Sequence, residues 1–79
     1  MDAFSLAAFK DGYCVSLGLF ETEAEAVKEA EYLAKYFFQF EGWEWADTSD
    51  GNELTPYTSD GYFDEEREND MIRVRLVWV

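Results

Sequence analysis

The sequence predicts an α+β fold: a two-layer β-β-α-β-β domain with one helix packed on one face of a four-stranded, mostly antiparallel sheet. Three patterns predict it, because the chain opens with a hairpin signal, continues with helical periodicity and closes with alternating apolar residues. With 79 residues there is room for a single domain, 1–79, and a hydrophobic content of 48% is enough to form its core.

The first two strands are expected within residues 3–19. Asp11-Gly12 lies between them, and this pair favours the type I′ turn of a two-residue hairpin. A regular register around that turn places Leu6 opposite Leu17 on the buried face. The uncovered face of the sheet would then carry Ser5, Ala7, Phe9, Cys14, Ser16, Arg73 and Arg75.

The helix is expected to begin after Thr22, an N-cap residue whose partner in a capping box is Glu25. Apolar residues then recur at helical spacing as far as Phe40, and Gly42 follows. Alternating residues predict a short strand at 43–46 and a longer one at 71–79.

Residues 41–70, called the acidic segment below, hold most of the charge. They contain 11 of the 18 acids and one base, Arg67, so they contribute −10 of the net −12. The sequence Thr-Ser-Asp-Gly occurs twice within the segment, at 48–51 and 58–61. Each Asp-Gly predicts a turn, and the two turns would bracket a short piece around 54–57.

Two interpretations of the acidic segment are open. It is either a solvated surface that keeps the protein soluble, or a docking surface for a basic partner. Aromatic residues interleaved with the acids favour docking, because aromatics in a charged rim are typical of interfaces. The candidate partner-binding residues are Glu44, Asp47, Asp50, Glu53, Tyr57, Asp60, Tyr62, Phe63, Asp64, Glu65, Glu66, Glu68 and Asp70.

The expected partner is a basic protein, specifically a nucleic-acid-binding surface whose Lys and Arg residues normally neutralise phosphates. Carboxylates at phosphate-like spacing would occupy that surface instead. Nucleic acid itself and an anionic membrane would repel this chain. The alternative is a structural module that forms homodimers through the open sheet face around Phe9 and Cys14.

Catalysis and metal binding have little support in the composition. There is no histidine and one cysteine, which excludes His-based triads and His- or Cys-rich zinc sites. Aligning Gly51 or Gly61 with the calcium-loop glycine puts Ala46 or Pro56 where an aspartate is required. We therefore expect no enzyme activity, cofactor or resident metal, and the lone Cys14 favours a cytoplasmic location.

Two resemblances follow from these residues. Tyr13–Phe20 followed by Glu23–Ala26 resembles the first strand and helix of the peptidoglycan-binding sporulation-related repeat domains, although the acidic segment replaces their second strand–helix–strand unit. In overall character, a small acidic domain without catalytic groups is similar to phage-encoded inhibitors of host defence, of the anti-CRISPR and anti-restriction type. Several of those inhibitors mimic nucleic acid, which implies the same role here, but no shared motif assigns site residues.

Overall fold

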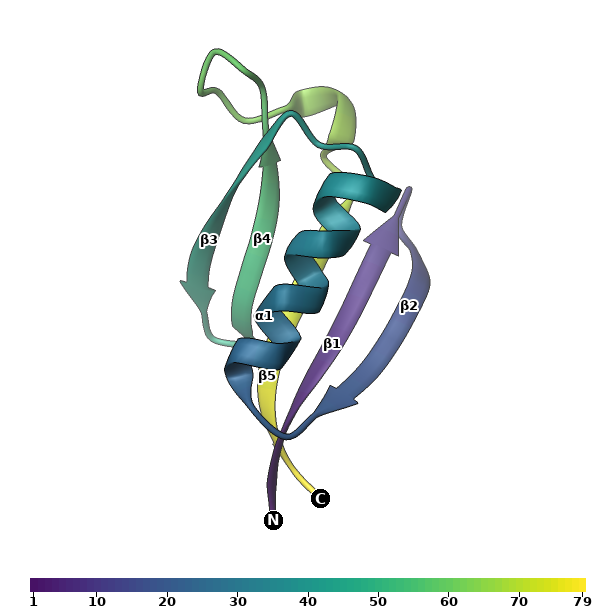
Figure 1. Cartoon of the computed structure of the whole chain (residues 1–79). Helices are drawn as coiled ribbons and strands as arrows, with labels where there is room; N and C mark the ends of the chain where they lie inside the picture. The colour runs from purple at the N-terminus through teal and green to yellow at the C-terminus, as the bar shows by residue number, and fades with distance from the viewer.

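The computed structural model describes all 79 residues as one helix against a five-stranded antiparallel sheet (Figure 1). The strand order is β2-β1-β5-β4-β3, and α1 covers one face. The α+β prediction is confirmed, but the sheet has five strands and not four. The elements are β1 (Asp2–Lys10), β2 (Tyr13–Phe20), α1 (Glu23–Tyr32), β3 (Gly42–Thr48), β4 (Gly51–Tyr57) and β5 (Met71–Trp78).

The fifth strand is β4, which sequence reasoning expected only as a short piece between two turns. Its residues, Gly-Asn-Glu-Leu-Thr-Pro-Tyr, give few apolar positions and include a proline, which usually argues against a strand. Leu54 and Pro56 are nevertheless buried on the face that α1 covers. Tertiary packing of these two residues therefore decides the local structure.

The β1–β2 hairpin turns at Asp11 and Gly12, both at positive φ, as predicted. Its register is not the predicted one. Cys14 pairs with Phe9, but Ser16 pairs with Ala8, so a β-bulge leaves one residue of β2 without a partner.

The bulge moves every later residue of β2 by one position. Leu6 lies opposite Gly18, and Leu17 lies opposite Ala7 on the open face, so the predicted Leu6–Leu17 contact is wrong. Ser16 was predicted on the open face, but it pairs with Ala8 on the covered face, so that prediction is wrong as well. The shifted register brings Phe20 against the core, and Gly18 leaves space for its ring because a Cβ there would lie 3.0 Å from it.

Helix α1 begins as predicted. Thr22 Oγ1 accepts a hydrogen bond from the Glu25 amide at 3.2 Å, and its hydroxyl donates to the Glu25 carboxylate at 2.9 Å. Three fully buried alanines spaced four residues apart then face the sheet, which lets the helix approach closely. They are Ala26, Ala30 and Ala34.

Helix α1 ends at Tyr32, and with its π-helical continuation the helical segment stops at Phe37, before the predicted end at Phe40. It widens into a π-helical turn over Leu33–Phe37, and the chain reverses at Gln39, which has φ 58. This reversal places the rings of Phe38 and Phe40 in the core, stacked with centroids 4.9 Å apart. None of the helical segments has the combination of length and apolar character that crossing a lipid bilayer requires.

Candidate functional site: the acidic segment

The acidic segment runs from β3 and β4 across one end of the sheet to the β1–β2 turn, and it separates into two groups. Residues 58–70, called the end loop below, lie at the top of Figure 1, and the β3–β4 turn lies toward the opposite end. The end-loop candidates are Asp60, Tyr62, Phe63, Asp64, Glu65, Glu66, Glu68 and Asp70. The β3–β4 candidates are Glu44, Asp47, Asp50, Glu53 and Tyr57.

Both repeated Thr-Ser-Asp-Gly sequences form the predicted turns. Gly51 and Gly61 have φ of 116 and 87. Thr48 Oγ1 donates to the Gly51 carbonyl at 2.9 Å, and Thr58 Oγ1 accepts from the Tyr62 amide at 3.3 Å. One turn therefore lies in each acidic group.

The end loop is held by hydrogen bonds along its length. The Thr58 amide donates to the Tyr62 carbonyl at 2.7 Å, and the Asp64 amide donates to the Pro56 carbonyl at 3.1 Å. The Ser59 amide donates to the Glu41 carboxylate at 2.8 Å. These bonds hold the backbone of the loop, so its course is defined without a partner.

Three candidate acids have structural partners inside the protein. Asp70 is buried, accepts a hydrogen bond from the Asp11 amide at 2.9 Å and lies 3.6 Å from Arg67. Asp64 caps the 3₁₀ turn at Glu65–Arg67 and lies 3.9 Å from the same arginine. The third is Glu53 in β4, which pairs with Arg73.

Arg67 is the only base of the acidic segment, and it points inward. Its guanidinium donates to the Phe38 carbonyl at 3.0 Å and lies over the Phe40 ring. Since it also contacts both acids just described, it does not neutralise the outer surface of the loop. The acids left exposed there are Asp60, Glu65, Glu66 and Glu68.

The exposed acids have no ion-pair partner. The structure contains three ion pairs, which involve three of the 18 acids and leave 15 without a base within 4.0 Å. No three acidic or thiol side chains converge closely enough to hold a metal ion. The surface is thus a set of separate carboxylates with an uncompensated negative field.

The predicted aromatic contacts divide into structural and exposed residues. Tyr57 and Phe63 pack edge to face with centroids 6.4 Å apart and pair through their backbones, which ties the loop to β4. Tyr62, at the loop tip, is mostly exposed. It is therefore the aromatic best placed to contact a partner.

Sequence reasoning missed the role of Glu31 on α1. Its Oε2 accepts hydrogen bonds from the indole nitrogens of Trp43 and Trp45, at 3.3 and 3.2 Å. The two tryptophans are half-buried on the covered side of β3. The alternation Trp-Glu-Trp places both indoles on one face, but nothing in the sequence identified their shared acceptor.

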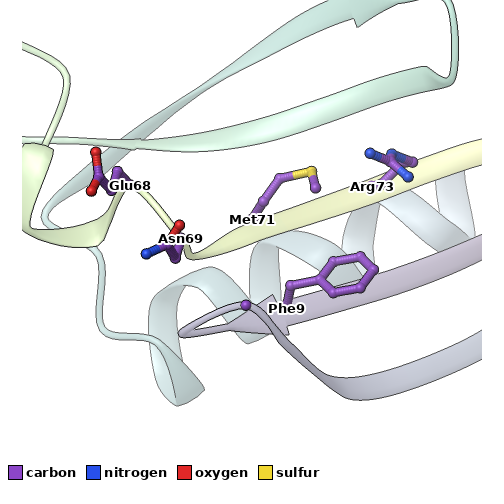
Figure 2. Close-up of a pocket in the computed structure, with 6 residues that line it drawn as sticks. Phe9, Glu68, Asn69, Met71 and Arg73 are labelled. Carbon is purple, nitrogen blue, oxygen red and sulfur yellow. The ribbon is translucent and has the colours of Figure 1, made fainter.

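The open face of the sheet is less charged than the acidic segment. Arg73 lies 3.0 Å from Glu53 across the β4–β5 pair, so these two charges compensate each other. Figure 2 shows Phe9, Met71 and Arg73 side by side on the face away from α1, where they line a shallow groove. The predicted open-face positions are thus correct in β1 and β5.

A scan of protein-family models and searches of curated proteins and solved structures find no match to this chain.

Proposed function

We propose that this protein is a non-enzymatic inhibitor whose acidic segment docks on a basic, nucleic-acid-binding surface of another protein. The observation that carries the proposal is the ordered end loop, whose only base is directed inward. A loop that served only solubility would not require this network of hydrogen bonds or an exposed tyrosine at its tip.

The density of charge supports a nucleic-acid-like role. The molecule measures 40 × 21 × 21 Å and carries 12 net negative charges, which is roughly one per 3.3 Å of its long axis. A single nucleic-acid strand carries one phosphate per about 3.4 Å. The net charge of the whole molecule per unit length is therefore comparable to that of a strand, and most of it lies in the acidic segment.

The test compares two variants with equal charge loss. The loop variant replaces Asp60, Glu65, Glu66 and Glu68 by their amides, and the control variant does the same for Asp2, Glu21, Glu23 and Glu29. All eight side chains are exposed and none accepts a hydrogen bond within the protein, so both variants should fold.

Each immobilised protein is exposed to cell lysate at 50 mM salt, and captured proteins are identified and then challenged with duplex DNA or RNA. We expect nucleic-acid-binding proteins on the wild type and the control variant, at least tenfold less on the loop variant, and release by added nucleic acid. Raising salt to 500 mM should mimic the loop variant, since screening shortens the field. Equal loss in both variants, or capture that nucleic acid does not compete, would contradict the proposal.

A further inference from the structure

The two edges of the sheet differ in charge. The outer edge of β3 carries exposed Glu44 and Asp47, which oppose pairing with another strand. The outer edge of β2 carries no charge of this kind, and its only irregularity is the bulge between Cys14 and Ser16. None of its eight residues, Tyr-Cys-Val-Ser-Leu-Gly-Leu-Phe, is charged at neutral pH, although 30% of the chain is.

Strand β2 is also unusually exposed for an apolar segment. Leu17 is 77% exposed and Leu19 is 62% exposed, both on the open face, and Tyr13 at the start of the strand is 76% exposed. Helix α1 leaves this edge uncovered (Figure 1). A long apolar edge strand without charge or proline is a template for pairing with another strand.

We infer that the outer edge of β2 pairs antiparallel with β2 of a second copy, forming a continuous ten-stranded sheet. This inference is independent of the proposed function. A second copy fits because β2 is self-complementary: pairing it with itself brings no like charges opposite each other at any position. A twofold axis near Leu17 would place that residue opposite its own copy on the open face.

The fold also keeps the acidic edges of the two copies apart. Strands β1, β5 and β4 lie between β2 and β3. At about 4.8 Å per strand, β3 is roughly 19 Å from the dimer seam, more than twice the screening length of about 8 Å at physiological salt. The charges on β3 therefore oppose this association less than they oppose pairing through β3. The end-loop acids lie against the β1–β2 turn, at one end of the seam and not along it.

The size of the contact sets the concentration at which it should form. Pairing centred on Leu17 joins residues 14–20 of the two copies, an edge roughly 23 Å long. With the exposed leucines beside it, the seam falls near the lower limit for specific interfaces, about 1,000 Å² in total. We expect a dimer that dissociates at micromolar concentrations.

The first test is analytical ultracentrifugation from about 1 to 200 µM, with Leu17→Lys compared with Ala46→Lys. Ala46 is exposed on β3, the other edge strand, so both changes add one positive charge to the open face of an edge. Circular dichroism establishes that each variant is folded. We expect wild type and Ala46→Lys to reach twice the 9.2 kDa chain mass, and Leu17→Lys to remain monomeric.

The second test uses the single cysteine, Cys14, which is free and exposed near one end of β2. Pairing centred on Leu17 separates the two Cys14 Cα atoms by roughly 20 Å, six residues along the seam. Spin labels at this position should report a pair distance of about 20–30 Å, allowing for the label arms. A wild type that stays monomeric at 200 µM, a dimeric Leu17→Lys variant, or a much longer distance would overturn the inference.

Discussion

Replacing Asp70 by alanine should destabilise the protein by about 2–4 kcal/mol. The carboxylate is 6% exposed and accepts the Asp11 amide at 2.9 Å. A hydrogen bond to a charged group contributes about 1.5–3 kcal/mol. The contact with Arg67, at 3.6 Å and one-third exposed on the arginine side, adds less than about 1 kcal/mol.

Urea unfolding followed by tryptophan fluorescence measures this loss, with the slope m expected to stay constant. The melting temperature should fall by about 10–25 °C. Asp70→Asn should lose about half as much, because its amide oxygen still accepts the Asp11 bond. Glu68→Ala is the control, since it removes an equal charge from the exposed loop and should change stability by less than about 0.5 kcal/mol. If Asp70→Ala and Glu68→Ala unfold alike, Asp70 does not hold the end loop to the hairpin.

Two further substitutions test other parts of the fold. Glu31→Ala leaves two indole donors without their acceptor and should reduce stability by about 2–3 kcal/mol. It should also shift the indole N–H resonances of Trp43 and Trp45, whereas Glu29→Ala should change neither stability nor resonances. Unshifted resonances in Glu31→Ala would contradict the shared acceptor. Gly51→Ala forces φ 116 on alanine and places its Cβ 2.6 Å from the Val74 carbonyl oxygen, so thermal unfolding should show a loss of at least about 2 kcal/mol. Gly12 is the control, because its φ is 84 but nothing lies within 4 Å of an added Cβ. Gly12→Ala should therefore reduce stability by only about 1 kcal/mol. Equal losses at the two glycines would refute the crowding at Gly51.

The sequence predicted the features that depend on local chemistry. The Asp11-Gly12 turn, the Thr22 cap and the two Thr-Ser-Asp-Gly turns are fixed by residues a few positions apart. The alternation of β5 was also visible, because its covered face carries Ile72 and Val74.

Features that depend on distant packing were not predicted. The predicted register of β2 is wrong because a regular hairpin would place Leu17 in the core, whereas the bulge packs Phe20 against the core instead. The strand β4 was not predicted, because it pairs with β5 through residues about 20 positions away in the sequence and carries few apolar side chains. For the acidic segment, the sequence located the charge, but it could not show that Asp64 and Asp70 have internal partners while their neighbours are exposed.

The central position of β5 has a consequence for how the chain folds. The two ends of the chain pair with each other, Asp2 with Trp78, and β5 is the strand that joins the β1–β2 hairpin to the β3–β4 hairpin. Each hairpin can close early from its own turn, but the sheet remains in two halves until β5 has left the ribosome. Because contacts between distant residues form slowly, insertion of β5 should limit the rate of folding. Until β5 is inserted, the edges of β1 and β4 that will pair with it are exposed, and chaperones can recognise such unpaired strand edges.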